Sequence, residues 1–304
     1  MGAIHIRPDN RLARIRVRLF GEGRILGARS EIATLPSVLW PIVGCLVSAP
    51  QHRQRRAVLA AELWPDHDEA AARHCLASAL WRIRQALPAD AQLLAAAGDW
   101  IVMEQSPRLW IDAVAFRLRT SRALANPGCL ADARERHRLA VALRHYDSAF
   151  LDGCDHEPIA LERERLRTLY LDGLYELATA EAQAEHWSMA RDLARALCEV
   201  EPLREDAQRL LITAYARCGN RALALKQYRT CEAVLAEQLD VAPMPDTIAL
   251  GREIGAAPMF ASTSAEAHVI ELKRMRTDLL EIVARIDRSL HASPSRTDPS
   301  STCL

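Results

Sequence analysis

The sequence predicts a mainly α protein: a small N-terminal α+β unit, a domain of paired helices, and a C-terminal amphipathic helix. Of its 304 residues, 50% are hydrophobic, 26% are charged and only 5% are aromatic. The abundant residues are Ala, Leu and Arg, and all three are strong helix formers. Because 304 residues exceed one average globular unit, we expect two domains of roughly 100–200 residues each.

The charges are distributed unevenly along a chain whose formal net charge is +0. Residues 1–90 contain thirteen arginines against eight acidic residues. The whole chain therefore has no net field that attracts an anionic polymer, but its N-terminal part has a local one. We expect any nucleic-acid surface to lie in this N-terminal third.

Cysteine spacing and apolar runs predict the cellular compartment. The eight cysteines are scattered singly, without a CxxC pair, which is typical of reduced thiols packed among apolar neighbours. The longest apolar run, residues 32–49, is interrupted by Pro36, Pro41 and Gly44, so it falls short of the roughly 20 residues of a membrane span. We expect a cytoplasmic protein with no membrane partner and no cofactor.

The first elements are two short strands. Residues 14–20 (RIRVRLF) place Ile15, Val17 and Leu19 on one face and arginines on the other, the period-two pattern of a half-buried strand. Glycines around residues 24–26 predict a turn into a second strand. Their GxGxxxG spacing is a poor phosphate loop, because no helix opens directly after it. A hairpin is the better interpretation.

Three helices follow the hairpin. Residues 35–48 are apolar and contain Pro41, which is tolerated in a first turn, so the regular helix should begin near that proline. A short helix is expected over residues 54–63 and ends at Trp64-Pro65. A third runs from residue 68 to residue 87, with Asp66 or Asp68 as its N-cap and an acidic first turn.

Short β-like runs close this first unit. Residues 92–94 and 100–103 are joined across Ala97-Gly98-Asp99, and residues 109–111 lead to Asp112. The order of strand pair, three helices and hairpin is typical of a winged helix-turn-helix of about 100 residues. We therefore place a winged-helix DNA-binding domain at residues 1–112.

Residues that bind metals or move protons crowd around the start of the third helix: Asp66, His67, Asp68, Glu69, His74 and Cys75. A zinc-binding helix needs two histidines four residues apart, and this helix has one. Capping and a favourable helix dipole explain the acidic residues without a metal. We predict no metal site, although a metal-dependent hydrolase remains the alternative that zinc analysis would test.

The third helix has two distinct faces. Leu76, Leu80, Ile83 and Leu87 fall at helical spacing and form its predicted core face. Its other face is a polar stripe of His74, Ser78, Trp81 and Gln85, flanked by Arg73, Arg82 and Arg84. That stripe suits a helix that reads bases in a major groove. It also suits a solvated helix whose arginines pair with the acids of its own first turn.

Beyond residue 112 the pattern is helical and repeats with a period of 34. The matching pairs are Leu177 and Leu211, Ala182 and Ala216, and Ala190 and Ala224. Turns are expected at Glu185-His186 and Gly219-Asn220. This period is typical of tetratricopeptide repeats, though ordinary helical hairpins would also satisfy it. We place a tetratricopeptide-like domain at residues 113–254.

The last part of the chain is predicted as a linker (255–265), an amphipathic helix (266–290) and a disordered tail (291–304). The helix carries a seam at alternating steps of three and four, with one charged interruption at Arg276: Val269, Leu272, Leu279, Val283, Ile286 and Leu290. Such a seam pairs two protomers in a short coiled coil, giving a homodimer. A helix docked on its own domain fits the pattern equally well.

Several segments together resemble one protein family. ELWPDHDEAAARHCLASALWRIRQAL (62–87) resembles the third-helix region of the OmpR-type winged helix in SARP-type regulators (Streptomyces antibiotic regulatory proteins). YDSAFLDG (146–153), LERERLRTLYLDGLYELA (161–178) and PDTIAL (245–250) are similar to the bacterial transcriptional activator domain that follows it in that family. So is the long segment from EPLREDAQ to DVAP (201–243). The resemblance covers residues 14–254.

This resemblance implies a DNA-binding transcriptional activator and no enzyme. The implied partners are double-stranded DNA, read by the third helix, and RNA polymerase or a second copy, contacted by the helical domain. The implied DNA-binding residues are Arg73, His74, Ser78, Trp81, Arg82 and Arg84 on the third helix, Arg53, Arg55 and Arg56 at the second, and the amides around Gly98 in the wing.

The chain departs from the family pattern at several positions. Val38 and Leu39, followed by Pro41, stand where the family usually has Arg or Lys, Ala77 replaces a residue that is often polar, and the wing carries Asp99. Each lost phosphate contact lowers the salt-dependent part of DNA affinity. The alternative function is therefore a tetratricopeptide-type adaptor whose winged helix binds protein.

Overall fold

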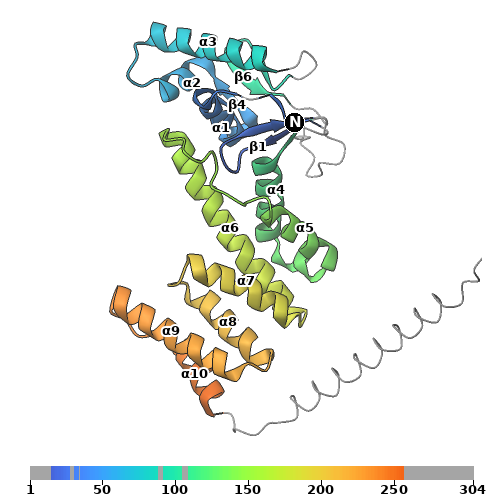
Figure 1. Ribbon diagram of the computed structural model, residues 1–304, viewed down its shortest axis with the longest axis vertical. Coiled ribbons are helices and arrows are strands. Elements are labelled where there is room, and N and C mark those ends of the chain that lie inside the picture. Colours follow the sequence, from blue (N-terminus) through green and yellow to red (C-terminus); the bar gives the residue numbers. More distant parts are fainter. Residues whose placement is uncertain (1–14, 28–30, 34, 88–91, 105–108, 257–304) are drawn as a thin grey trace, which may run out of the picture.

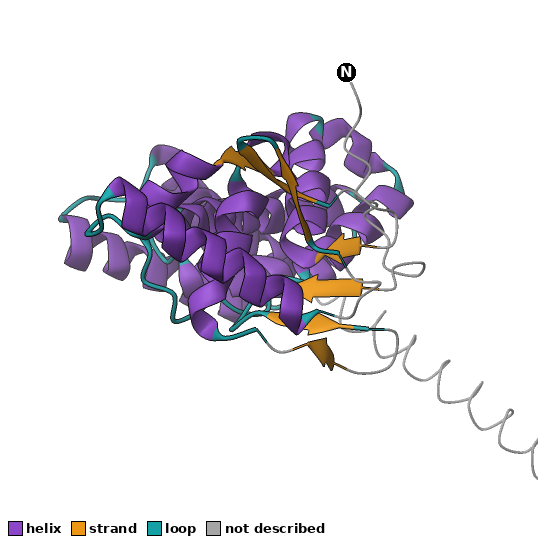
Figure 2. Cartoon of the chain, turned by 90° about the horizontal axis from the view of Figure 1, so that it is seen from above, coloured by secondary structure: helices purple, strands orange, loops and turns teal. Residues whose placement is uncertain are grey.

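The computed structural model describes residues 15–27, 31–33, 35–87, 92–104 and 109–256. Figure 1 shows an elongated molecule with helix α3 at one end and helices α9 and α10 near the other. The strands lie together in one part of the molecule, and helices make up the rest (Figure 2). The described part of the chain is therefore mainly α, as predicted.

The first sheet has four strands in the order β3-β2-β1-β7. Its strands are β1 (Ile15–Arg18), β2 (Arg24–Leu26), β3 (Glu31–Ala33) and β7 (Leu109–Ile111). β1 pairs antiparallel with β2, which confirms the predicted hairpin. β1 also pairs in parallel with β7, so the run before Asp112 belongs to this sheet and not to the wing.

Three helices and a second sheet follow. They are α1 (Trp40–Ser48), β4 (Arg53–Arg55), α2 (Arg56–Leu63), α3 (Glu69–Ala86), β5 (Leu94–Ala97) and β6 (Trp100–Met103). Pro41 lies in the first turn of α1, as predicted. The prediction that residues 54–63 form one helix is wrong at its start, because residues 53–55 pair as a strand with β6. α2 begins only at Arg56.

A buried carboxylate joins the first sheet to the helices that follow. Asp112 opens α4 (Asp112–Ala125) and is 1% exposed. Its carboxylate accepts hydrogen bonds from the backbone N–H groups of Leu19 (2.8 Å), Phe20 (3.2 Å) and Ala113 (2.7 Å). Leu19 and Phe20 follow directly after β1, so this one side chain fixes the end of the central strand against α4.

The same strand end is held from its other side by the loop after α5 (Ala133–Leu143). Leu151 donates its N–H to the carbonyl of Leu19 (2.8 Å) and Gly21 donates to the carbonyl of Ala149 (2.8 Å). The guanidinium of Arg163 in turn donates to the carbonyls of Phe150 and Leu151. These contacts tie the first sheet to α6 (Glu157–Gln183).

One hydrophobic core runs across residue 112, where the sequence places a domain boundary. Its buried side chains extend from Val17 to Ala180. Phe20 packs edge-on against Phe116, with ring centroids 5.5 Å apart, and Gly44 lets α1 approach Ile159 so closely that a Cβ would lie 2.5 Å from its Cδ1. The division at residue 112 stays a prediction, but the two parts share this core.

The C-terminal helices form the predicted pairs. They are α6, α7 (Trp187–Val200), α8 (Glu205–Arg217), α9 (Arg221–Leu239) and α10 (Pro245–Ala256). His186 donates its N–H to Glu181 across the first turn, and Asn220 donates to Tyr215 across the second, both at 2.9 Å. These bonds are 34 residues apart and confirm the repeat. α10 runs two residues into the predicted linker.

Other predictions fall beyond these ranges. The rest of the linker, the amphipathic helix with Val269, Leu272, Leu279, Val283, Ile286 and Leu290, and the tail lie outside the described residues. Among the described helices, none has both the length and the apolar character of a membrane span.

The role of Asp112 is tested by Asp112→Asn. An amide nitrogen cannot accept a hydrogen bond, whereas both oxygens of the carboxyl group can in either protonation state, so buried N–H donors lose a partner. We expect the free energy of unfolding to fall by about 1–3 kcal/mol. Asp155→Asn, which changes an exposed aspartate, is the matched control and should leave urea denaturation unchanged.

The stability contributed by Asp112 should also depend on pH. Burial raises the pKa of its carboxyl to about 7 against the opposing effect of its hydrogen bonds. Because the pKa is raised in the folded state, the folded protein binds this proton more tightly than the unfolded chain does. The resulting contribution to the free energy of unfolding is complete at low pH and declines as pH rises toward 7. The free energy of unfolding of the native chain should therefore exceed that of Asp112→Asn by more at pH 5 than at pH 7.5. A difference that does not change with pH would contradict this.

Candidate nucleic-acid interface

Helix α3 begins at a capped N-terminus. The Asp68 carboxylate accepts a hydrogen bond from the N–H of Ala71 at 2.8 Å, and the first-turn Glu69 pairs with Arg73 four residues on. Both contacts use acids that the sequence places at the start of the helix. Asp68 is therefore the cap. The presence of this aspartate at the start of the helix is explained by capping and needs no metal ion.

The buried face of α3 is narrower than predicted. Ala72, Leu76, Ala79 and Ile83 are buried, whereas Leu80 and Leu87, expected in the core, are only half-buried. Leu80 and Leu87 still pack against the core, so the predicted core face is confirmed in full at Leu76 and Ile83 and at the edge of the core for the two other leucines. Ala72 and Ala79 were not predicted to be buried.

The opposite face of α3 is open to solvent. Trp81 is 60% exposed, and the other side chains predicted to meet DNA on this helix are exposed as well: Arg73, His74, Ser78, Arg82 and Arg84. Burying a tryptophan is strongly favourable, and here the exposed indole lies beside several exposed arginines, which makes this face of α3 the candidate interface. Ala77 is also exposed and offers this face only a methyl group.

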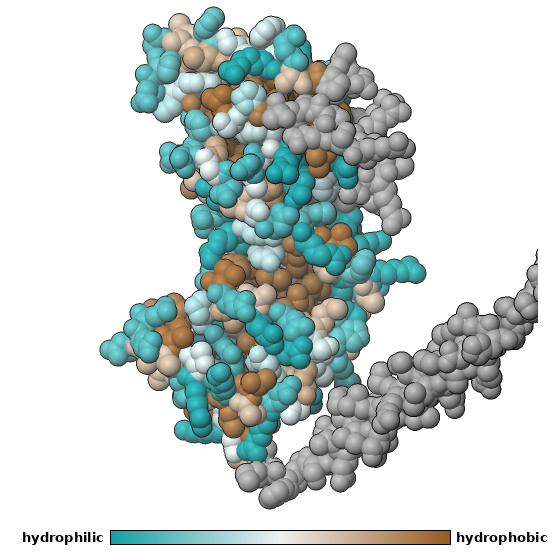
Figure 3. Space-filling model, viewed as in Figure 1, coloured by the Kyte–Doolittle hydropathy of each residue, from teal (hydrophilic) through white to brown (hydrophobic). Residues whose placement is uncertain are grey.

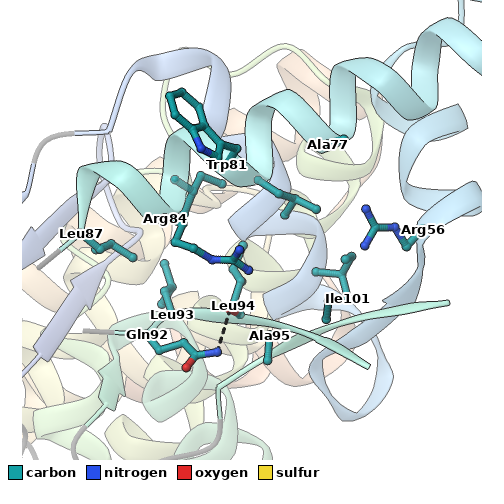
Figure 4. A pocket seen from close by; sticks show the side chains of 13 residues that line it. Arg56, Ala77, Trp81, Arg84, Leu87, Gln92, Leu93, Leu94, Ala95 and Ile101 are labelled. Atoms are coloured by element: carbon teal, nitrogen blue, oxygen red, sulfur yellow. Dashed lines mark hydrogen bonds between the residues drawn. The ribbon is translucent and has the colours of Figure 1, made fainter. Parts of the chain in front are cut away.

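A groove of about 400 Å³ separates α3 from the wing hairpin. Figure 4 shows Arg84 pointing from α3 across it toward Leu94 and Ala95 of β5, with Arg56 at its other end. Trp81 points away from the hairpin in the same view. Arg84, Arg56 and Trp81 therefore all line one groove, and the Trp81 ring extends from it away from the hairpin.

Arg53 and Arg55 form a separate group. The two guanidinium carbons lie 4.8 Å and 5.4 Å from the ring centroid of Trp100 in the neighbouring strand. Arg55 is directly opposite Trp100 in the pairing of β4 and β6, so these side chains share one face of the wing sheet. The same residues line a hollow together with Pro158 and Leu161 of α6. The resemblance put both arginines at the second helix, and this is wrong because they lie on β4.

Trp100 was not among the residues predicted for the interface. Once residues 53–55 are known to form a strand, the spacing of Arg53 and Arg55 at i and i+2 places two cations on one face. Stacking on an aromatic ring holds a guanidinium in place and leaves its N–H groups free for an acceptor. Trp100 therefore belongs to the candidate interface as the residue that positions Arg53 and Arg55.

The wing turn and the first helix carry little positive charge. Gly98 adopts a φ of +60° at the hairpin turn with nothing within 4 Å of an added Cβ, and the carbonyl of Asp99 accepts from the N–H of Arg56 at 2.8 Å. Val38 is 52% exposed and Leu39 is buried. The positive charge of this end therefore comes from β4, α2 and α3.

The described residues contain no group of three or more His, Cys, Asp or Glu side chains arranged to hold a metal ion. Asp66, His67 and His74 are all exposed. What this end of the molecule offers chemically is a set of guanidinium donors and one exposed indole, which recognise anionic and aromatic groups.

The chain was compared with known proteins. Residues 111–255 match the family described as bacterial transcriptional activator domain. The fold is similar to that of Mycobacterium tuberculosis EmbR in complex with a low affinity phosphopeptide, with a TM-score of 0.68 and 21% sequence identity over 87% of this chain and 71% of that one. Comparison with curated protein sequences gives no match.

These findings define a class of protein, a transcription regulator in which helix pairs follow a winged helix-turn-helix. The helical part is a bacterial transcriptional activator domain, and the α+β unit before it carries the helices and wing described above. A winged helix-turn-helix followed by this domain is the arrangement that the resemblance to SARP-type regulators predicts.

The two faces of α3 are tested by a pair of substitutions. Leu76→Ala removes a side chain that is 1% exposed, and we expect it to lower the free energy of unfolding by about 2–5 kcal/mol. Trp81→Ala removes an exposed one and should change it by about 0.5 kcal/mol or less. Chemical denaturation of both variants decides the point: a large loss in Trp81→Ala would place that residue in the core.

Proposed function

We propose that this regulator binds double-stranded DNA through α3 and the wing sheet and activates transcription through its helical domain. The observation that carries the proposal is the exposed face of α3, where Trp81 is 60% exposed among arginines on a helix whose opposite face is buried. A helix of this kind fits a major groove when short polar side chains meet base edges and arginines meet phosphates.

The residues divide by role. His74, Ser78 and Trp81 lie along one stripe of α3 and are assigned to base edges. Arg73 and Arg82 flank that stripe and are assigned to phosphates, with Arg84 and Arg56 in the groove beside the wing. Arg53 and Arg55, held by Trp100, are assigned to the backbone next to the wing.

A gel-shift experiment tests DNA binding. The full chain is titrated onto the DNA upstream of its own coding region, at two salt concentrations. Arg82→Ala and Arg84→Ala should weaken binding to every sequence and flatten the salt slope by about 0.9 per lost phosphate contact. Ser78→Ala and Trp81→Ala should instead change the preference among sites.

Arg134→Ala is the matched control, because Arg134 is an exposed arginine on α5, outside the proposed interface. It should leave both affinity and salt slope unchanged. If the native chain gives no shift even at low salt, DNA binding is excluded. The adaptor function would then be preferred, in which the exposed face of α3 binds a protein.

Contact with RNA polymerase is proposed for the outer face of α7. Met189 and Val200 are 52% and 47% exposed and, being eleven residues apart, lie on one side of the helix. Figure 3 shows hydrophobic side chains gathered over the middle of the molecule, in the region of α6 and α7. Exposed apolar patches mark protein-binding surfaces.

Met189→Asp and Val200→Asp test this contact. In a transcription assay with purified polymerase and saturating regulator, each should lower activation several-fold and leave the gel shift unchanged. Leu223→Asp on α9, where Leu223 is 45% exposed, is the control. Equal activation by all three variants would remove α7 from the polymerase contact.

A further inference from the structure

A groove of about 540 Å³ lies on the inner side of the C-terminal helices. Its walls come from α6, α8 and α10, with the start of α7 at one edge. Tyr175, Trp187, Leu210 and Leu250 supply apolar surface, all of them half-buried. This is the concave side of the helix pairs, which in repeat proteins is left open to receive a binding partner.

The groove also carries negative charge. Asp206, Asp246 and Glu253 line it together with Arg209, and two further arginines, Arg204 and Arg217, lie over its Tyr175 and Trp187 rings. Asp206 is engaged by Arg204 at 3.1 Å, whereas Asp246 and Glu253 are exposed along α10. An occupant that matches this groove therefore needs an apolar stripe with cations beside it.

We propose that residues 266–290 of this same chain, which lie outside the described residues, dock into this groove as an amphipathic helix. Their sequence combines the apolar seam at Val269, Leu272, Leu279 and Val283 with the basic cluster Lys273, Arg274 and Arg276, which lies between the acids Glu271 and Asp278. A helix laid in a groove uses anchors at steps of three and four, which is the spacing of this seam.

The connection between the two is short. Asp246 lies ten residues before the end of α10 at Ala256, about 15 Å away at 1.5 Å per residue. The nine residues 257–265 reach about 30 Å when extended, enough to return the chain to the groove. A tether of this length gives an effective concentration on the order of millimolar, so even a weak contact is populated.

Arg276 favours the groove over a second copy of the chain. It falls within the seam, between Leu272 and Leu279. In a symmetric parallel coiled coil, this arginine would face the same arginine of its partner, and like charges at a packed seam oppose pairing. In the groove it meets Asp246 or Glu253 instead.

Hydrogen exchange of the full chain tests the proposal. Asp246→Lys with Glu253→Lys should raise the exchange of amides in α8 and α10 on the order of tenfold, because the docked segment is released. Lys273→Glu with Arg276→Glu should do the same. Combining both pairs restores the charge match and should return exchange toward the native value.

Two further variants complete the design. Leu279→Asp with Val283→Asp breaks the apolar stripe and should raise exchange as well, while Glu237→Lys, an exposed acid on α9 outside the groove, should not. The molar mass from light scattering is measured across a range of concentrations, and the intramolecular contact requires a monomer throughout.

Two outcomes would overturn the proposal. If none of the segment variants changes exchange in α8 or α10, the segment does not occupy the groove. If the native chain is a dimer and the protection of the groove follows protein concentration, a second copy is the occupant. Neither measurement uses DNA, so failure here is distinguishable from failure of the proposed DNA binding.

Discussion

The arrangement of the whole molecule depends on how the end of strand β1 is held. The N–H groups of Leu19 and Phe20 are bound by the Asp112 carboxylate on one side, while the carbonyl of Leu19 accepts from Leu151 on the other. Arg163 of α6 fixes that second segment through three carbonyls. A rotation of the first sheet against the helices would strip partners from several buried groups, each at about 1–3 kcal/mol.

This anchoring makes the described residues one mechanical unit. Arg117 of α4 donates to the carbonyl of Val47 at the end of α1 and pairs with Glu162 of α6 at 3.0 Å, and Gly44 allows α1 to pack directly on α6. In the proposed complex with DNA, these contacts would hold the helical domain in one orientation, without an ordering step that would weaken binding.

The features that could be predicted from the sequence are those determined by residues close together in the chain. The cap of α3 follows from an aspartate before an acidic turn, and the two turns 34 residues apart follow from repeated small residues; both are confirmed. Strand β4 could not be predicted in the same way, because Arg53, Gln54 and Arg55 show no apolar alternation and their pairing partner β6 lies far along the chain. For the same reason the parallel pairing of β7 and the buried role of Asp112 were missed. The exposure of the α3 residues is confirmed, and their contact with DNA stays a prediction.

The position of Trp100 compensates for what the first helix and the wing turn lack. Val38 and Asp99 supply no cation, so in the proposed complex the backbone contacts near the wing come from Arg53 and Arg55, with Arg56 and Arg84 in the neighbouring groove. An arginine loses up to about 2 kcal/mol of side-chain entropy when it is fixed. Stacking on Trp100 already restricts these side chains in the free protein. Less side-chain entropy is therefore lost when a phosphate is bound. Two preorganised arginines can in this way replace a larger number of mobile ones.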